Sequence, residues 1–362
     1  MYDKEEIINR LQTNPSKENI LELLHANGEQ QNVLLKAAAE IKSKYVGNVV
    51  YFRGLIEYSN FCEKNCKYCG IRKDNKKISR YLMTEQEVID AALYAWQENY
   101  ASIALQAGEL SSEKYIRKIN ALLERINAET NNELGITLSL GEQNEKTLKM
   151  WKEKWGVRRY LLRIETSNRE LYEKIHPNNE THSYQKRVET LKLLRKLNYQ
   201  VGTGVMVGLP FQTLESLAED ILFFKDLDVD MIGMGPYIEH SDTPLYEYKD
   251  TLLPVVERYN LTLKMIAICR IIFKDINIVA STAMQAIDFR GREAAIMAGA
   301  NIIMPNLTPQ KYRENYLLYQ NKPCLNEDVH HCKKCLENRI QLTGNKIGYG
   351  QWGDAKHYFS RQ

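Results

Sequence analysis

The stretch 49-VVYFRGLIEYSNFCEKNCKYCGIR-72 joins a short apolar run to a loop that contains three cysteines. The run 49–59 is rich in β-branched and aromatic residues, and this composition predicts a β-strand. Seven further runs of strand type follow along the chain, at 101–108, 135–141, 159–166, 201–209, 231–238, 278–283 and 301–308. The cysteine loop therefore follows the first of eight predicted strands.

Amphipathic helical patterns separate these strands. The pattern at 84–98 begins with Thr84 and Glu87 in the spacing of a capping box. The others lie at 112–128, 144–154, 184–197, 213–227, 256–273 and 290–298. Eight strands that alternate with helices predict an α/β protein with a TIM-type (β/α)8 barrel. A doubly wound open sheet is the alternative, but no glycine-rich nucleotide turn follows the first strand.

The predicted barrel divides the chain into three parts. Residues 1–45 form an N-terminal helical segment, 46–310 the barrel, and 311–362 a C-terminal extension. Barrels of this type bind ligands at the mouth, where loops follow the C-terminal ends of the strands. The cysteine loop, the segment 106–109 and the pair Arg163 and Glu165 all occupy such positions, which supports the fold prediction.

Composition and charge narrow the class of protein. The chain has 362 residues with 49 basic and 46 acidic ones, a net charge of +3. This balance gives no sign of nucleic acid or a membrane as partner. The N-terminal stretch is polar and amphipathic, without the apolar core of a signal peptide, so we expect a cytoplasmic protein. Seven cysteines at short spacings favour metal ligation over disulfides.

The three cysteines of the first loop, Cys62, Cys66 and Cys69, are one short of a closed tetrahedral site. A structural zinc ion with a fourth ligand from elsewhere is one interpretation. A cubane 4Fe-4S cluster is the other, because three thiolates then leave one iron with an open position for a small molecule.

This spacing, Cys-x3-Cys-x2-Cys with Tyr68 before the last cysteine, resembles the radical S-adenosylmethionine (SAM) superfamily. The resemblance implies that the three cysteines hold a 4Fe-4S cluster, and that the amino and carboxylate groups of SAM bind the open iron. It also implies reductive cleavage of SAM to a 5′-deoxyadenosyl radical. The resemblance further implies SAM contacts at Gln106, Gly108, Glu109, Ser139, Glu165 (ribose), Arg187 (methionine carboxylate) and Gly208 (adenine). An ordinary turn at 106–109 and a solvated helix face at Arg187 are the alternatives.

From about residue 30 to the C-terminus, the chain resembles the HydE family of FeFe-hydrogenase maturases. The resemblance is carried by segments such as 161-LLRIETSN-168, 231-MIGMGPYIEHSDTPL-245 and 291-GREAAIMAGANIIMPNLTP-309. A second cysteine set, Cys324, Cys332 and Cys335, has the spacing of the accessory 2Fe-2S site of some family members. A zinc site with His330 or His331 is the alternative. We expect this second site near the surface, well away from the first, and Cys269 as an inert core thiol.

The resemblance also implies a substrate and partners. Family members act on a small iron complex with cysteine, carbonyl and cyanide ligands, which the maturase HydG supplies, and HydF is a further expected partner. Arg163 is the candidate cation for this anionic substrate, because a guanidinium grips a carboxylate at two points. A salt bridge to a neighbouring strand is its alternative role. Tyr316 is a second catalytic candidate, and Thr137, Ser281, Thr282 and Tyr319 are expected to line the pocket.

Three other functions compete with this interpretation. A biotin-synthase-like sulfur inserter requires additional cysteines inside the barrel, and the predicted strands contain none after Cys69. A methylornithine-synthase-like mutase shares much of the scaffold and acts on an amino acid. The third alternative is a carrier that only transfers iron–sulfur clusters. No histidine is assigned a catalytic role, and no acid–base pair is visible in the sequence.

Overall fold

The structure, a computed structural model, describes residues 2–327 and 329–361, apart from the side chains of His330, His331 and Cys332. Each of the eight predicted strands is present, and all pairings between them are parallel. The first is divided into β1 (Val49–Phe52) and β2 (Gly54–Ser59). The others are β3 (Ser102–Ala107), β4 (Gly135–Ser139), β5 (Arg159–Leu161), β6 (Gln200–Thr203), β8 (Met231–Pro236), β9 (Asn277–Ala280) and β10 (Ile302–Ile303). A two-residue strand, β7 (Met206–Val207), extends the fifth run beside β8.

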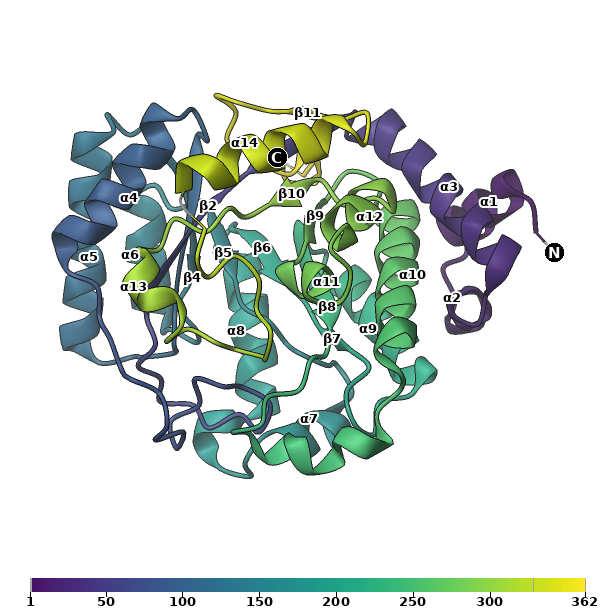
Figure 1. Ribbon diagram of the computed structural model, residues 1–362, viewed down its shortest axis with the longest axis horizontal. Helices are drawn as coiled ribbons and strands as arrows, with labels where there is room; N and C mark the ends of the chain where they lie inside the picture. Colours follow the sequence, from purple (N-terminus) through teal and green to yellow (C-terminus); the bar gives the residue numbers. More distant parts are fainter. Residues whose placement is uncertain (1, 328, 362) are drawn as a thin grey trace.

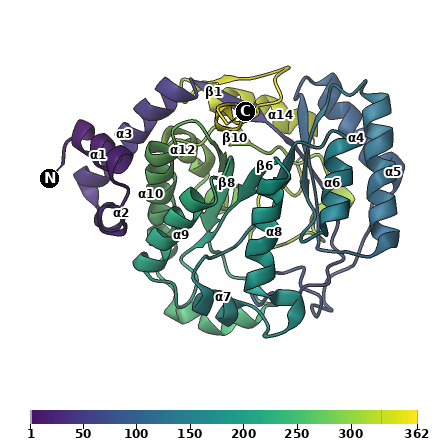
Figure 2. The same ribbon diagram turned by 180° about the vertical axis from the view of Figure 1, so that it is seen from behind.

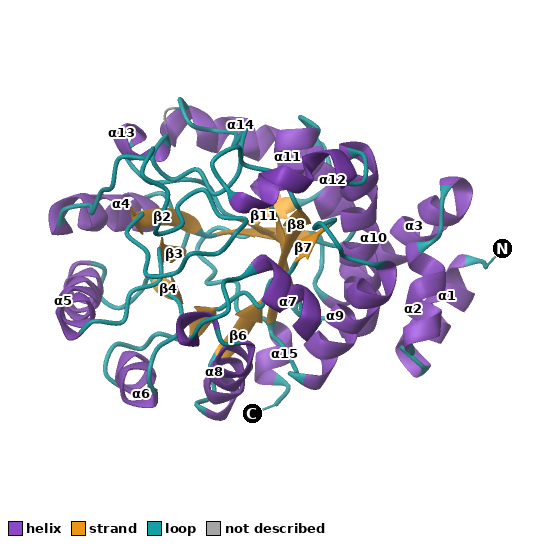
Figure 3. Ribbon diagram, turned by 90° about the horizontal axis from the view of Figure 1, so that it is seen from below, coloured by secondary structure: helices purple, strands orange, loops and turns teal. Residues whose placement is uncertain are grey.

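The divided first strand closes the sheet into a barrel. β1 pairs with β10 through Tyr51 and Ile302, whereas β2 pairs with β3 through Gly54 and Ile103. A bridge between Leu55 and Asn306 continues the contact with the last strand. Because β1 and β2 are consecutive in the chain, one strand position contacts both the second and the eighth. The predicted barrel is therefore confirmed, and Figure 3 shows its strands inside a ring of helices.

The seven predicted helices of the barrel are also present: α4 (Glu85–Gln97), α5 (Glu113–Glu129), α6 (Glu145–Glu153), α8 (Tyr184–Lys196), α9 (Leu214–Asp226), α10 (Val255–Phe273) and α12 (Gly291–Met297). At the start of α4, the Thr84 hydroxyl accepts from the Glu87 amide and the Glu87 carboxylate accepts from the Thr84 amide, as the capping box requires. Several further elements were not predicted: α7 (Arg169–Ile175), η1 (Glu180–His182), η2 (Pro244–Thr251), α11 (Thr282–Ile287), α13 (Gln310–Arg313), α14 (Val329–Gln341) and α15 (Lys356–Phe359).

The N-terminal helices α1 (Lys4–Thr13), α2 (Lys17–Leu24) and α3 (Gly28–Tyr45) lie against the outside of the barrel (Figures 1 and 2). They pack on α10, and α2 also contacts α9. α10 is consequently buried on most of its surface, and Cys269 at its centre is fully buried among apolar side chains. This is the environment expected of an inert core thiol.

The C-terminal extension reaches both ends of the barrel. Tyr316, Tyr319, Lys322 and Cys324 line the cavity at the mouth. At the opposite end, β11 (Lys346–Ile347) pairs with β1, and the Gly353 carbonyl accepts a hydrogen bond of 3.0 Å from the buried guanidinium of Arg53. The extension thus closes the floor and shapes the mouth. No helix in the described ranges is long and apolar enough to span a bilayer.

Candidate active site

A cavity of about 350 Å³ opens at the C-terminal ends of the strands. The cysteine loop forms one part of its wall, the ends of β3, β4 and β5 another, and the loops after β8, β9 and β10 the remainder. Cys62, Cys66 and Cys69 all line this cavity. The three sulfur donors that the sequence places in one loop therefore face one common space.

The cysteine loop is held by main-chain hydrogen bonds. The Cys62 sulfur accepts from the amides of Lys64 and Glu109, at 3.4 and 3.3 Å. Burial raises the pKa of Cys62 to about 11 and that of Cys66 to about 12. Glu109 adds to both shifts, and the Cys62 thiol adds to the shift of Cys66. Both thiols are neutral near pH 7, so binding of iron displaces their protons. Among the described residues, no three His, Cys, Asp or Glu side chains are arranged around a single metal-ion position.

Gly108 allows the cysteine loop to lie against the end of β3. A Cβ atom at this position would stand 2.3 Å from the Phe61 carbonyl oxygen and 2.7 Å from the Cys62 Cβ. The Gly108 amide also donates to the Ser59 carbonyl at 3.0 Å, and this hydrogen bond holds the end of β3 against the start of the cysteine loop. The donor set and this cradle fit a cluster with three sulfur ligands and one position open to the cavity, better than a closed zinc site.

Tyr68, the aromatic residue before the last cysteine, is positioned by a histidine. The His176 Nδ1 lies 2.9 Å from the Tyr172 carbonyl, which can only accept, so Nδ1 carries the proton. The Nε2 atom therefore accepts from the Tyr68 hydroxyl at 3.2 Å. Burial lowers the pKa of His176 to about 3, and the ring is neutral. Sequence reasoning missed this pair because His176 lies more than a hundred residues away.

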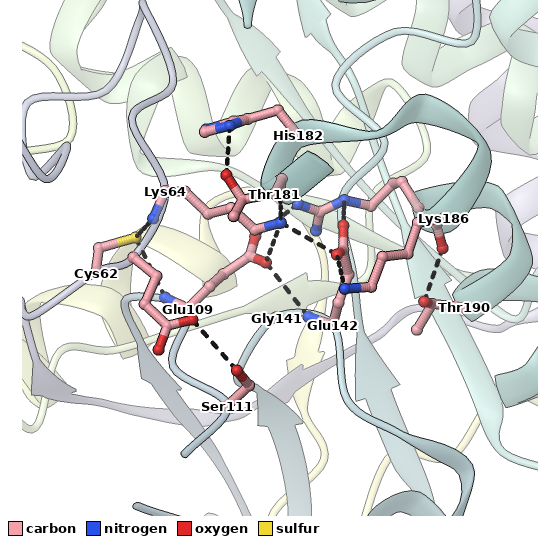
Figure 4. A network of polar contacts seen from close by, with 12 residues as sticks. Cys62, Lys64, Glu109, Ser111, Gly141, Glu142, Thr181, His182, Lys186 and Thr190 are labelled. Atoms are coloured by element: carbon pink, nitrogen blue, oxygen red, sulfur yellow. Dashed lines mark hydrogen bonds and ion pairs between the residues drawn. The ribbon is translucent and has the colours of Figure 1, made fainter. Parts of the chain in front are cut away.

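Two predicted SAM contacts, Glu109 and Arg187, belong to one largely buried ion network. Figure 4 shows its members Lys64, Glu109 and Glu142. The Arg187 guanidinium lies 2.8 Å from Glu109 and 2.9 Å from Glu142, and the Lys64 ammonium lies 3.1 Å from Glu142. Burial acts to raise the pKa of Glu109, but Arg187 and Lys64 outweigh it and lower that pKa below its ordinary value. Glu109 is therefore a carboxylate beside the cysteine loop. Arg187 is buried, which excludes the solvated helix face considered for it.

Arg163 and Glu165 both line the cavity and are bonded to each other. Two hydrogen bonds of 2.8 Å join the guanidinium to the two carboxylate oxygens, and Arg163 also donates to the Gly233 carbonyl. Glu165 has a φ of 65°, a left-handed conformation that non-glycine residues rarely adopt. Arg163, the residue predicted to bind the anionic substrate, is thus bonded directly to Glu165, the residue predicted to bind the ribose.

The part of the wall formed by the loops after β9 and β10 carries hydroxyl groups. The Thr282 and Tyr319 hydroxyls lie 2.8 Å apart, and the Tyr316 hydroxyl accepts from the Gln106 amide at 3.2 Å. The Ser281 hydroxyl is buried and has no hydrogen-bond partner among the residues that the structure describes, so it is free to bond a ligand. Most of the residues predicted for this region lie on the cavity wall: Gln106, Ser139, Ser281, Thr282, Tyr316 and Tyr319.

Two predicted site residues lie elsewhere. Thr137 sits two residues before Ser139 on the same face of β4, hence one layer closer to the floor, where it accepts a 2.9 Å hydrogen bond from Arg159. Gly208 follows β7 with a φ of 85°, and a Cβ there would meet the Arg258 side chain of α10. The structure does not place either residue on the cavity wall.

The second cysteine set begins at the same cavity. Cys324 lines the cavity wall and accepts a hydrogen bond of 3.2 Å from Arg292, whereas Cys335 is exposed on α14. The side chain of Cys332 lies outside the described residues. The position of Cys324 differs from the expected location away from the first cysteine set, because residues 314–327 cross the mouth before α14 begins.

Sequence reasoning also missed a buried acid–base pair on the wall. The Lys322 ammonium lies 2.5 Å from the Glu57 carboxylate, and the Asn306 amide donates to the other Glu57 oxygen at 3.2 Å. Glu57 is on the first strand and Lys322 in the C-terminal extension, so no local pattern connects them. Only the closed barrel brings them together.

Comparison with known proteins gives a consistent result. The Radical SAM superfamily model matches residues 56–224. The chain is 42% identical to the [FeFe] hydrogenase maturase subunit HydE of Thermotoga maritima, over 98% of both chains. It is 29% identical to 3-methylornithine synthase of Methanosarcina acetivorans, over 80% of this chain and 78% of that one.

Solved structures show the same fold at lower identity. Methylornithine synthase (PylB) superposes with a TM-score of 0.78 and 23% identity, over 96% of this chain and 97% of that chain. The FeFe-hydrogenase maturase HydG from Carboxydothermus hydrogenoformans superposes with a TM-score of 0.81 and 18% identity, over 98% of this chain and 81% of that chain.

Proposed function

The chain belongs to the HydE family of FeFe-hydrogenase maturases, which are radical SAM enzymes, and from this premise we propose how its residues divide the work. Cys62, Cys66 and Cys69 hold the 4Fe-4S cluster that the family implies. When bound, the cluster and SAM supply a 5′-deoxyadenosyl radical. The protein holds the radical precursor against its target and excludes water and stray hydrogen donors.

SAM is proposed to lie between the cysteine loop and the ends of β3 to β5. Glu109, a carboxylate beside Cys62, accepts from its amino group, and Arg187 supplies the cation for its carboxylate. Glu165 accepts from the ribose hydroxyls, while Gln106, Gly108 and Ser139 shape the adjoining wall. These roles are supported by the common cavity and by the charged state of Glu109.

The substrate is proposed to be a small anionic iron complex that carries cysteine, carbonyl and cyanide ligands. Arg163 grips its carboxylate, and Ser281, Thr282, Tyr316 and Tyr319 donate hydrogen bonds from the loops after β9 and β10. The radical attacks the sulfur of the cysteine ligand, which remodels the complex toward the hydrogenase di-iron subcluster. HydG as supplier of the complex, HydF as a further partner, and a cytoplasmic location belong to the same proposal.

An accessory 2Fe-2S cluster on Cys324, Cys332 and Cys335 is a separate proposal. Cys324 supports this proposal because it faces the cavity. Cys335 does not add support, because it is exposed on α14. We expect Cys332→Ala to retain SAM cleavage, because none of these cysteines belongs to the first loop. Complete loss of cleavage in this variant would show that the second set is not accessory.

One observation carries the main proposal: the three cysteines of one loop line a single cavity of about 350 Å³ at the mouth of the barrel. The test is anaerobic reconstitution with iron and sulfide, followed by SAM cleavage under dithionite. The wild type should release 5′-deoxyadenosine, and Cys66→Ala should release none while the barrel remains folded by circular dichroism. Normal cleavage by Cys66→Ala, or no cleavage by the reconstituted wild type, contradicts the proposal, and the second result favours a passive cluster carrier.

The mutase is the second candidate, favoured by the 29% identity to 3-methylornithine synthase. It predicts a rearranged amino acid as product. Incubation with a mixture of the standard amino acids and SAM, followed by amino-acid analysis, separates the two functions. A new branched amino acid supports the mutase, whereas activation of an FeFe-hydrogenase in a coupled maturation assay supports the maturase.

A further inference from the structure

Positive charge is concentrated on the cysteine loop. Residues 61–80 contain seven basic and two acidic side chains, although the whole chain has a net charge of only +3. Two of these charges are already paired: Lys64 forms an ion pair with Glu142, and Arg80 donates to backbone carbonyls of the loop. Lys73 and Lys76 are exposed, and neither forms an ion pair with any described residue. The loop therefore presents unpaired positive charge to solvent.

An aromatic residue is exposed beside this loop. Phe211 is 48% exposed and has a φ of 67°, which is unfavourable for a bulky residue. Gln212 builds the turn, since its side-chain oxygen accepts from the Gly208 and Leu209 amides at 2.6 and 3.1 Å. The Phe211 ring packs edge-on against Tyr248 at 4.7 Å, with the Lys174 ammonium 5.4 Å from its centre. Folding gains little from a strained, exposed ring, so contact with another molecule explains it better.

Lys67 connects this surface to the cysteines. It lies between Cys66 and Cys69, and its amide donates to the Ile175 carbonyl while its carbonyl accepts from the Leu245 amide, both at 3.0 Å. Its ammonium donates to the Lys174 carbonyl at 2.9 Å. Tyr68 and Tyr248 pack against the same small apolar cluster under Phe211. We call Lys67, Lys73, Lys76, Lys174, Phe211 and Tyr248 the loop patch. The first three lie on the cysteine loop, and the other three are joined to Lys67 by successive contacts.

We propose that the loop patch is the docking surface for a small acidic electron-transfer protein of low reduction potential. The proposal rests on the proposed function, in which each SAM cleavage consumes one electron from outside. The donor protein is oxidised by one electron, the cluster relays it, and the C5′–S bond of SAM breaks to give methionine and the 5′-deoxyadenosyl radical. Redox encounters of this kind use small interfaces in which complementary charge sets the association rate.

The experiment compares two electron sources with the same reconstituted enzyme. Release of 5′-deoxyadenosine is measured with dithionite and with reduced flavodoxin, a small acidic flavoprotein, as the probe. The test variant is Lys73→Glu/Lys76→Glu/Lys174→Glu, and the matched control is Lys36→Glu/Lys114→Glu/Lys118→Glu, with the same charge change on exposed positions of α3 and α5. Phe211→Asn is a milder variant, because asparagine tolerates a positive φ.

Binding of oxidised flavodoxin to each variant is measured as well, by titration calorimetry at low salt. The test variant should bind it about 10-fold more weakly than the wild type and, with reduced flavodoxin, should cleave SAM about 10-fold more slowly. The control variant and all dithionite rates should remain within about 2-fold, and the wild-type flavodoxin rate should fall with added salt. Equal flavodoxin rates for test and control variants would overturn the docking proposal. Failure of the wild type with dithionite would instead overturn the proposed function, so the two failures are distinguishable.

Discussion

The guanidinium of Arg163 grips the carboxylate of Glu165 through two hydrogen bonds of 2.8 Å. The two residues are separated by one position after β5, and the positive φ of Glu165 turns its side chain back toward Arg163. Each group therefore sets the orientation and charge of the other. A ligand that draws Arg163 away must leave Glu165 with another partner. If the two residues have the proposed roles, we expect SAM binding and substrate binding to be coupled through this pair.

Glu165→Gln is expected to weaken SAM binding. The amide cannot accept the charge-assisted bidentate contact, so both the ribose ligand and the orientation of Arg163 are lost. We expect the KM for SAM to rise about 10-fold, with iron content unchanged. Steady-state release of 5′-deoxyadenosine measures this, and Glu173→Gln, in an exposed pair with Arg169, is the control. An unchanged KM would show that Glu165 does not contact SAM.

Gly108→Ala is expected to abolish cluster retention while the barrel stays folded. The added methyl would stand 2.3 Å from the Phe61 carbonyl oxygen, and the backbone of the cysteine loop must move to relieve this contact. Iron and sulfide content after reconstitution measures the effect. Gly233→Ala is the matched control, because its Cβ meets nothing closer than the Arg163 guanidinium at 3.7 Å. Full iron content in Gly108→Ala would mean that the loop adapts freely.

The sequence predicted what local patterns determine. Eight strands and seven helices follow from hydrophobic periodicity, and the cysteine triplet lies within eight residues, so its members meet in any fold. The height of a residue along a strand depends on barrel stagger, which periodicity does not contain. For this reason the sequence could not show that Ser139 reaches the level of the cavity whereas Thr137, on the same face of β4, lies below it. The helices α7 and α11 were missed for another reason: they are too short to show a full amphipathic pattern.

Contacts between distant segments were the other omission. Glu57 and Lys322 each look like an ordinary charged residue in the sequence, yet they form a buried pair on the cavity wall. The same holds for Tyr68 with His176, and for Glu142 with Arg187. Tertiary closure creates these pairs, and no spacing rule along a single chain predicts them.

Lys322→Met is expected to destabilise the protein by about 3–5 kcal/mol, because it leaves the Glu57 carboxylate buried without its cation. The thermal midpoint of the apoprotein should fall accordingly. The double variant Glu57→Gln/Lys322→Met should recover much of the loss. Lys311→Met removes the exposed partner of Glu87 in the same extension and should leave the thermal midpoint nearly unchanged. Equal effects of the two lysine substitutions would contradict a structural role for the buried pair.

Asp220 makes the stability of the barrel depend on pH. It lies fully buried on α9, and its carboxyl accepts from the amide and hydroxyl of Ser167, which follows β5. Burial raises the pKa of Asp220 to about 7, above the ordinary value of 3.8. Between these values the folded state keeps a proton that the unfolded state has lost. This group's contribution to stability is therefore complete below about pH 4 and declines as the pH rises toward 7.

Asp220→Asn keeps the oxygen acceptor and removes the titration. The stability of this variant relative to the wild type should rise between pH 4 and pH 7, by at most about 4 kcal/mol at 1.36 kcal/mol per pH unit. Thermal midpoints of both apoproteins across this range measure the difference. Asp226→Asn, at the exposed end of the same helix, should show no such trend. A pH-independent difference for Asp220→Asn would show that this carboxyl is ionised in the folded protein throughout the range, which would place the Ser167 hydrogen bonds above burial in setting its charge.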